Sequence, residues 1–252
     1  MVAKALEGRT GADAVVVDLE DGVPSAARDE AVATMLSLYD ADAAIPVYCR
    51  IRSPLVEALE DLALVPRWFA GTVLAKAEEP AVVAAVSGAS RGRELWLLIE
   101  SARGVERLGD LLAAASIDGV MLGGTDLRAD LGARRTDDEI ELLYARGRMV
   151  SISAAHGIRN VVDTPEAAID DPEGLEGIAS RVRALGFTGK ACIHPKQVPV
   201  VQASFAPSVD EIEWARSVLK AVDGAQRVGG ELVDEATKRI ARTILAERAA
   251  QD

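Results

Sequence analysis

Residues 14–18 read AVVVD, a run of β-branched residues that ends in a carboxylate. Because the apolar residues are continuous rather than alternating, this run predicts a strand that is buried on both faces, as in a parallel sheet. Six further runs of this kind follow, at residues 46–50 (PVYCR), 72–76 (TVLAK), 95–100 (LWLLIE), 119–124 (GVMLGG), 159–163 (RNVVD) and 190–194 (KACIH). Parallel strands need a crossover between them, so helices are expected in the intervals.

Helical patterns do lie between these runs. They are predicted at residues 26–38, 103–115, 140–155 and 175–185. Thr136 with Glu139 forms a capping box before the third of these segments. Gly186 follows the fourth segment and is predicted to be its C-cap. The chain therefore alternates strand and helix along most of its length.

The predicted strands end near residues 18, 50, 76, 100, 126, 163 and 194. Their mean spacing of about 29 residues is the size of one strand–helix–strand step, which predicts an α/β fold with right-handed crossovers. Such even spacing favours a (β/α)8 TIM-type barrel over a doubly wound sheet, and no G-x-G-x-x-G motif follows the first run. Seven runs are present where a closed barrel has eight, so the sequence predicts a barrel that lacks its first strand.

The C-terminal residues break this rhythm at Pro207. A capping box of Ser208 with Glu211 predicts a helix directly afterwards. A Gly-containing linker and a last helix follow, at residues 223–230 and about 234–249. The sequence therefore predicts two domains, a barrel at residues 1–206 and a C-terminal helical arm or lid at residues 207–252.

The composition excludes several classes of protein. The 252 residues are 49% hydrophobic and 27% charged, which is typical of a globular chain, and no run approaches the roughly 20 apolar residues of a membrane span. The net charge of −12 repels phosphate backbones, so no nucleic-acid partner is expected, and the lack of a spanning run means that no membrane partner is expected either. The N-terminal residues do not form a secretory signal, and Cys49 and Cys192 lie in apolar runs that suit a reducing cytoplasm.

Ionisable side chains gather at the predicted carboxyl ends of the strands, where (β/α)8 barrels carry their active sites. They are Asp18, Glu20, Asp21, Arg50, Arg52, Lys76, Glu100, Asp126, Asp163 and His194. Any one of them could be a solvated loop charge. The whole ring is harder to explain in that way, because unpaired buried charge is costly, and we expect these groups to pair with one another or with a ligand.

Glu100 and Asp126 end neighbouring strands. Two converging carboxylates, with no cysteine near them, suit a hard cation such as Mg²⁺, although they could instead accept hydrogen bonds from Arg50 or Lys76. Arg50 is the best candidate to hold a substrate carboxylate, because a guanidinium binds one through two parallel hydrogen bonds. An ion pair between Arg50 and residues 20–21 is the alternative, and both interpretations can hold together.

Several segments, in this order, resemble the HpcH/HpaI aldolase and citrate lyase β-subunit superfamily, and specifically its CitE-like acyl-CoA lyases. They are residues 11–23 (GADAVVVDLEDGV), 50–52 (RIR), 74–78 (LAKAE), 98–104 (LIESARG), 123–127 (GGTDL), 185–190 (LGFTGK), 193–197 (IHPKQ) and 205–208 (FAPS). Each motif alone is moderately specific, and the ordered set is strong. The resemblance extends from residue 4 to about residue 240.

This resemblance implies a (β/α)8 barrel, often trimeric, that binds Mg²⁺ through Glu100 and Asp126. It implies a lyase that cleaves or forms the carbon–carbon bond of a β-hydroxyacyl-CoA thioester of the malyl-, citramalyl- or citryl-CoA type. The smaller molecules in that reaction are acetyl-CoA, or a related acyl-CoA, and a 2-oxo acid. Arg50 matches the substrate-binding arginine, and Glu100 is expected to contact substrate as well as metal.

The resemblance also implies roles for further residues. Asp18 and Glu20 match an acidic strand-end motif and are expected to be catalytic. Asp234 resembles a lid aspartate that enters the site of a neighbouring subunit, where it would act as a general acid. Lys76 is expected to bind substrate, and Lys4 is expected to keep part of the CoA-binding role.

Two other functions stay open at this stage. One is an HpaI-type aldolase acting on a hydroxy-oxo acid without CoA, but such enzymes rely on a histidine early in the barrel, and both histidines of this chain come late. The other is a catalytically weak subunit or scaffold, which a missing first strand would favour. The presence of Glu100, Asp126 and Arg50 favours catalysis.

Overall fold

The structure is a computed structural model of the chain, and it describes residues 5–38, 43–220, 226–228 and 231–249. Seven parallel strands form one sheet in the order of the sequence. They are β1 (Val15–Asp18), β2 (Val47–Ile51), β3 (Gly71–Leu74), β4 (Glu94–Ile99), β5 (Gly119–Leu122), β6 (Asn160–Asp163) and β7 (Gly189–Lys190). Because all seven are parallel and sequential neighbours pair, their carboxyl ends share one edge of the sheet.

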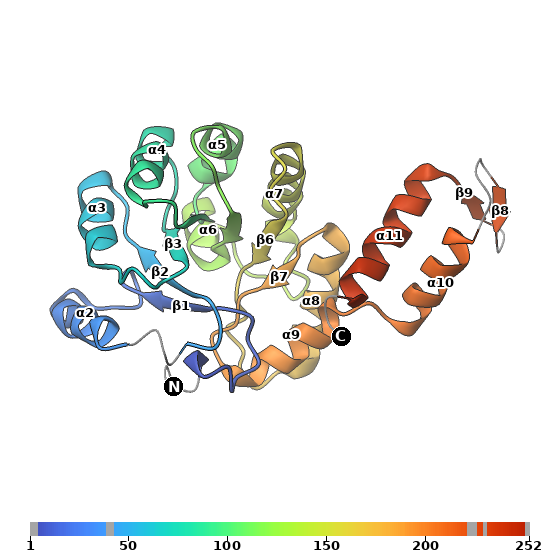
Figure 1. Cartoon of the computed structure of the whole chain (residues 1–252), viewed down its shortest axis with the longest axis horizontal. Helices are drawn as coiled ribbons and strands as arrows, with labels where there is room; N and C mark the ends of the chain where they lie inside the picture. The colour runs from blue at the N-terminus through green and yellow to red at the C-terminus, as the bar shows by residue number, and fades with distance from the viewer. Residues whose placement is uncertain (1–4, 39–42, 221–225, 229–230, 250–252) are drawn as a thin grey trace. The chain divides into compact units, whose positions relative to one another are not determined.

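Helices connect the strands. They are α2 (Arg28–Leu36), α3 (Leu55–Leu64), α4 (Pro80–Ala89), α5 (Ala102–Ala113), α6 (Gly124–Leu131), α7 (Leu143–Ala155), α8 (Pro172–Leu185) and α9 (Val198–Phe205), with short 3₁₀ turns η1 (Ser25–Ala27), η3 (Ile140–Leu142) and η4 (Pro195–Gln197). Figure 1 shows the sheet curved, with α2, α3, α4, α5 and α7 along its outer side. Within the described residues β1 and β7 do not pair, so the sheet is an open half-barrel of the TIM type. The predicted α/β class and its seven parallel strands are confirmed.

Apolar side chains fill both faces of the sheet at its central strands, as the continuous runs predicted. The prediction is wrong for β1, because it is an edge strand of the sheet and its Val16 is 42% exposed. Leu97 and Ile99 of β4 are fully buried, and so are Leu108 and Leu111 of α5. On the other face, Tyr48 packs edge-to-face on Trp96 with ring centroids 5.8 Å apart. The two faces together hold the strand ends in fixed positions relative to one another.

Two further local predictions are wrong. Glu139 forms no capping box with Thr136; it adopts a left-handed conformation with φ of 53°, because its buried carboxylate accepts hydrogen bonds from Arg128 and Arg146. The last strand was predicted over residues 190–194, but β7 ends at Lys190. The amides of the next turn donate instead to the side chain of Gln197, which replaces a sheet partner.

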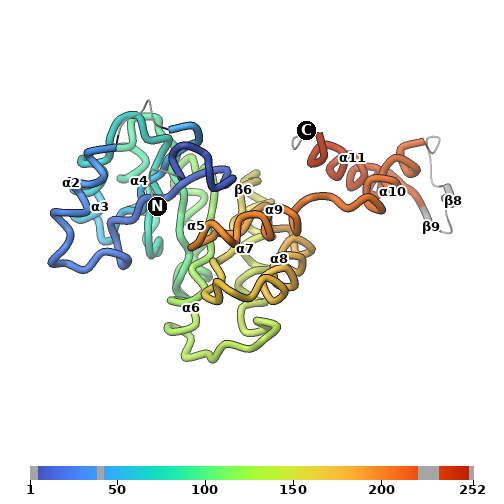
Figure 2. Tube along the Cα trace, turned by 90° about the horizontal axis from the view of Figure 1, so that it is seen from below, coloured from blue at the N-terminus to red at the C-terminus, as the bar shows by residue number. Residues whose placement is uncertain are grey.

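The chain divides into two compact units, residues 1–201 and 202–252. The second contains α10 (Val209–Leu219), a two-stranded ribbon of β8 (Gln226–Val228) and β9 (Glu231–Val233), and α11 (Glu235–Ala249). Figures 1 and 2 show α10 and α11 side by side, and Ala215, Val218 and Ala241 form part of their buried interface. The capping box of Ser208 with Glu211 is confirmed.

The ribbon of β8 and β9 was not predicted, because residues 223–230 read as a linker; of these, 223–225 and 229–230 lie outside the described part. The domain boundary at residues 206 and 207, and the role of residues 207–252 as an arm or lid, stay predictions. Throughout the part of the chain that the structure describes, each helix is too short or too polar to cross a lipid bilayer.

Candidate active site

The carboxyl ends of β1 and β2 bring Asp18 and Arg50 together as register partners. Arg50 Nε donates to Asp18 Oδ1 (2.7 Å), and Arg50 Nη2 donates to Asp18 Oδ2 (2.5 Å). Burial alone would raise the pKa of Asp18, but the hydrogen bonds from Arg50 and from the backbone of Glu20 hold it below its usual range. The side chain of Asp18 thereby fixes the plane of the Arg50 guanidinium.

Asp18 also organises the loop that follows β1. Its Oδ1 accepts from the amide of Glu20 (2.9 Å), and its Oδ2 accepts from the amide of Gly22 (2.9 Å). A Cβ at Gly22 would lie 2.2 Å from Asp18 Oδ2, so this close approach requires glycine. The loop therefore points Glu20, which is 8% exposed, back towards the strand ends.

Lys76, two residues after β3, completes this part of the cluster. Its Nζ donates to Glu20 Oε1 (2.6 Å) and to Asp21 Oδ2 (2.5 Å). Arg50 Nη1 lies 3.6 Å from Glu20 Oε2, so Glu20 stands between the two cations. Lys76 has φ of 47°, a left-handed conformation that turns its backbone amide towards β4.

That amide donates to Glu100 Oε1 over 2.8 Å. Glu100 follows β4 directly and is 3% exposed. The pKa of Glu100 is raised to about 7, chiefly by burial and also by the negative charges of Asp126 and Glu20, against the lowering effects of the Lys76 amide and Arg50. A buried carboxylate of this kind favours the binding of a cation, because the positive charge would offset the desolvation free energy of the ionised carboxylate.

Asp126 lies in the first turn of α6, and the backbone before it packs tightly on Glu100. A Cβ at Gly123 would lie 2.4 Å from Glu100 Cβ and 2.6 Å from Glu100 Oε2. Glycine at this position therefore lets the start of α6 approach the carboxylate of Glu100. The two acidic side chains predicted as a pair from the sequence share one end of the sheet.

The cluster carries an excess of negative charge. Its five carboxylates (Asp18, Glu20, Asp21, Glu100 and Asp126) face two cations, Arg50 and Lys76, so its formal charge is −3 when every group is ionised. Among the described residues no three His, Cys, Asp or Glu side chains are placed to hold a metal ion together. A hard divalent cation that takes only Glu100 and Asp126 from the protein, and its other ligands from water and substrate, fits this donor set.

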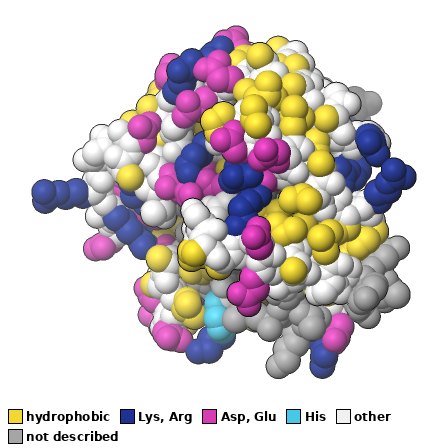
Figure 3. Space-filling model, turned by 90° about the vertical axis from the view of Figure 1, so that its left-hand side faces the viewer, with side chains coloured by type: hydrophobic (Ala, Val, Ile, Leu, Met, Phe, Trp, Pro, Cys, Tyr) yellow, Lys and Arg dark blue, Asp and Glu magenta, His cyan; other side chains and the backbone are white. Residues whose placement is uncertain are grey.

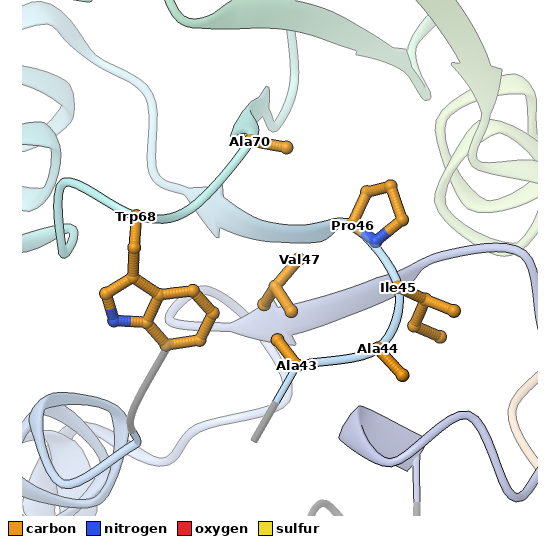
Figure 4. Close-up of a pocket in the computed structure, with 7 residues that line it drawn as sticks. All are labelled: Ala43, Ala44, Ile45, Pro46, Val47, Trp68 and Ala70. Atoms are coloured by element: carbon orange, nitrogen blue, oxygen red, sulfur yellow. The ribbon is translucent and has the colours of Figure 1, made fainter. Parts of the chain in front are cut away.

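Basic and acidic side chains are also mixed on the face of the molecule in Figure 3, where dark blue and magenta groups lie interspersed. A pocket of about 270 Å³ lies elsewhere, beside Pro46 and Val47 at the start of β2 and Ala70 before β3. Figure 4 shows its apolar lining, including Trp68. It is at the amino ends of the strands and holds no ionisable side chain, so the cluster at the carboxyl ends is the better candidate site.

Residues 2–195 match the profile of the HpcH/HpaI aldolase/citrate lyase family. The chain belongs to this family. The prediction made from the ordered motifs is confirmed, and with it the assignment of the chain to a family of lyase enzymes.

Three relatives illustrate this membership of the HpcH/HpaI aldolase/citrate lyase family. A citrate lyase subunit beta-like protein of Deinococcus radiodurans is 33% identical over 261 residues, covering 96% of this chain and 91% of the relative. A (3S)-malyl-CoA thioesterase of Cereibacter sphaeroides is 30% identical over 260 residues, covering 97% and 90%. The crystal structure of CitE from Mycobacterium tuberculosis with magnesium, acetoacetate and coenzyme A superposes with a TM-score of 0.84 at 30% identity, covering 98% of this chain and 93% of that one.

Two predicted site residues of this family member remain, Asp234 and Lys4. Asp234 belongs to the second unit, where it is exposed and caps α11: its Oδ1 accepts from the Thr237 amide and hydroxyl (both 2.9 Å), and these bonds lower its pKa. Lys4 lies outside the described residues. The catalytic role of Asp234 and the CoA-binding role of Lys4 stay predictions.

Two members of the predicted strand-end ring have structural partners instead. Arg52 turns away from Arg50 and pairs with fully buried Asp61 through Nε (3.0 Å) and Nη2 (2.7 Å). Asp163 is also fully buried and accepts from Arg146 Nε (2.9 Å) and Lys190 Nζ (2.7 Å). The expectation that the ring groups pair with one another therefore holds for Arg50 and Lys76 with the acidic residues after β1. Arg52 pairs instead with α3, and Asp163 pairs with α7 and β7.

Replacing Gly123 with alanine is expected to lower the free energy of unfolding by about 1–3 kcal/mol, because the added Cβ overlaps Glu100 Cβ and Oε2. Thermal or urea unfolding measures this loss. Gly88→Ala in α4 is the matched control: no atom lies within 4 Å of its added Cβ, so it should leave stability unchanged or raise it by up to about 1 kcal/mol. Equal stability of the two variants would contradict the packing of Glu100 against Gly123.

Proposed function

We propose that this chain is a Mg²⁺-dependent carbon–carbon lyase that cleaves, or forms, a β-hydroxyacyl-CoA thioester of the malyl-, citramalyl- or citryl-CoA type. The products of cleavage would be acetyl-CoA, or a related acyl-CoA, and a 2-oxo acid. The observation that carries the proposal is buried Glu100 beside Asp126, with Arg50 held at the same strand ends. Its similarity to a CitE solved with magnesium, acetoacetate and coenzyme A supports the same reaction class.

Glu100 and Asp126 would hold the metal ion, which when bound supplies a Lewis acid that stabilises negative charge on the substrate oxygens. Arg50 would bind the carboxylate of the 2-oxo acid. Asp18 accepts from Nε and from one N–H of Nη2, so the second N–H of Nη2 and the two N–H groups of Nη1 remain to bind a ligand. Asp18 would therefore act on substrate through Arg50, whose orientation it fixes.

Proton transfer is the second requirement, because cleavage removes a hydroxyl proton and leaves a thioester enolate that must be protonated. Glu20 is placed to take part, since it lies between Arg50 and Lys76 at the same strand ends. Asp234 is the proposed donor to the enolate. Its hydrogen bonds to Thr237 lower its pKa, so Asp234 would have to leave them and enter surroundings that raise its pKa before it could deliver a proton.

The proposal extends to partners and location. Lys4 would contribute to CoA binding, Lys76 to substrate binding, and Asp234 would act in the site of a neighbouring subunit of a homotrimer. A cytoplasmic location is proposed from the reduced cysteines and the acidic composition. These statements rest on the family resemblance and the sequence.

A product assay tests the proposed reaction. The protein is incubated with malyl-, citramalyl- and citryl-CoA, with and without Mg²⁺, and both free thiol and 2-oxo acid are measured. A lyase releases 2-oxo acid without free CoA thiol. Free thiol without 2-oxo acid would instead identify a thioesterase, the activity named for the Cereibacter sphaeroides relative. Absence of both products with every thioester would favour a catalytically weak subunit.

Arg50→Lys is expected to lower kcat/KM by about ten- to a hundredfold, because lysine keeps the charge but loses the planar fork that Asp18 orients. Steady-state kinetics with the best thioester measures the loss. Arg52→Lys is the matched control, since Arg52 lies two residues along, turns away, and pairs with Asp61. Similar losses in the two variants would show that Arg50 has no special role in binding substrate.

A further inference from the structure

The first backbone amide of α6 is capped by a side chain from another part of the chain, the residue that follows β6. Gly123, the N-cap residue, has no side chain to offer, and the amide of Gly124 has no partner inside the helix. That amide donates to Thr164 Oγ1 over 2.9 Å. Thr164 directly follows β6 and is 2% exposed, so its hydroxyl is an internal part of the fold.

The contact between Thr164 and α6 allows little displacement. A Cβ at Gly124 would lie 2.9 Å from Thr164 Cγ2 and 3.0 Å from Leu142 Cδ1. Thr164 thus fixes the helix backbone two residues before Asp126, which is the proposed metal ligand. Any shift of this turn moves the Asp126 carboxylate relative to Glu100.

Thr164 is itself held by buried charge. Its carbonyl accepts from Lys190 Nζ (2.6 Å), and the same Nζ donates to Asp163 Oδ2 (2.7 Å). The side chains of Lys190 and Asp163 are fully buried, so neither can swing into solvent. The backbone that carries the Thr164 hydroxyl is therefore held in place by buried hydrogen bonds.

A second hydrogen bond joins α6 to the backbone that follows Glu100. The amide of Ala102, two residues after Glu100, donates to Asp130 Oδ2 over 2.7 Å. Asp130 lies four residues after Asp126, so both project from one side of α6. Helix α6 is thus hydrogen-bonded at its start to the residue after β6, and near its last turn to the first residue of α5.

From these contacts we infer that Thr164 is a positioning residue that sets the place of Asp126 for Mg²⁺ binding. The inference rests on the proposed function, because it takes Glu100 and Asp126 as the protein ligands of that ion. Thr164 does not touch the ion. Its hydroxyl fixes the first turn of α6, and removing a group that orients a metal ligand typically weakens metal affinity by ten- to a hundredfold.

Thr164→Val and Thr164→Ser test the inference in the full chain. Valine keeps the branched shape and removes the hydroxyl acceptor, whereas serine keeps the acceptor. Calorimetric titration of the metal-free protein with MgCl₂ is expected to give a Kd about tenfold higher for Thr164→Val and within about threefold of the parent for Thr164→Ser. In the lyase assay, Thr164→Val should need about tenfold more Mg²⁺ for half-maximal rate, with kcat largely recovered at saturating Mg²⁺.

Thr188→Val is the matched control, because Thr188 Oγ1 accepts from the Val161 amide (3.0 Å) at the opposite end of β6. It should leave the Kd for Mg²⁺ unchanged. A parent chain that binds no Mg²⁺ would overturn the proposed function and the inference together. A parent chain that binds Mg²⁺, with Thr164→Val binding it equally well or Thr164→Ser as weakened as Thr164→Val, would overturn the inference alone.

Discussion

Replacing Glu100 with glutamine is expected to lower Mg²⁺-dependent lyase activity by at least about a hundredfold while leaving the chain folded. Glutamine keeps the Oε1 atom that accepts the hydrogen bond from the Lys76 amide, so we expect the turn after β3 to keep its conformation. It removes the buried negative charge that the proposed metal site needs. The rise in melting temperature that Mg²⁺ gives the parent chain should therefore be lost in this variant.

The same substitution is expected to stabilise the metal-free protein at alkaline pH. The pKa of Glu100 is about 7 in the folded chain, because of burial and of the charges of Asp126 and Glu20, against an ordinary value of 4.5. Below pH 4.5 the carboxyl is protonated in both folded and unfolded chains, and it does not affect stability. Between pH 4.5 and 7 the unfolded chain releases a proton that the folded chain keeps, so stability falls as pH rises and the full penalty applies above pH 7.

At pH 8 without metal, Glu100→Gln should exceed the parent in free energy of unfolding by up to about 3 kcal/mol, and this difference should vanish near pH 4.5. Urea unfolding at pH 4.5, 6 and 8 measures it. Glu176→Gln, at an exposed position of α8, removes the same charge without burial and should change stability little at any of these pH values. A pH-independent difference, or a Glu100→Gln protein that Mg²⁺ still stabilises, would contradict the site.

The strands could be predicted because their signal is local. A run such as residues 95–99 (LWLLI) is apolar at every position, and a strand covered on both faces buries such a run. The end of each run then places its polar residue at one edge of the sheet. Strand order brings Asp18 next to Arg50 and Glu100 near Asp126. The two hydrogen bonds from Arg50 to Asp18 were not predicted, because the sequence pointed to residues 20–21 as the partners of Arg50.

The partners of those polar residues could not be predicted in the same way. Residues 14–18 and 159–163 both end in Val-Val-Asp, yet Asp18 holds Arg50 of the next strand, whereas Asp163 holds Arg146 of α7. A strand pattern shows where a side chain lies along the sheet, but the helix that packs over it decides what it contacts. Glu139 is a second example. Its carboxylate pairs with buried Arg146, and it does not form the capping box with Thr136 that the local sequence predicts.

The buried ion pairs around Asp163 lead to the second large effect. Asp163→Ala is expected to lower the free energy of unfolding by about 3–5 kcal/mol, because it leaves the cations of Arg146 and Lys190 in the interior with too few acceptors. Chemical denaturation measures the loss. Asp170→Ala is the surface control: Asp170 pairs with Lys196 but its side chain is 82% exposed, so its removal should cost no more than about 1 kcal/mol.

The physical cause of that loss can be separated from simple loss of packing by a double variant. If the cost lies in an uncompensated buried cation, Asp163→Ala combined with Lys190→Met should be more stable than the sum of the two single changes predicts, by about 1–3 kcal/mol. Methionine is long enough to fill the space of the lysine stem and carries no charge. Strictly additive losses would show that Asp163 contributes through shape alone. Asp163 and Asp18 both follow two valines in the sequence, but only Asp163 is fully buried. Additive losses would mean that pairing with buried cations is not the reason for this difference.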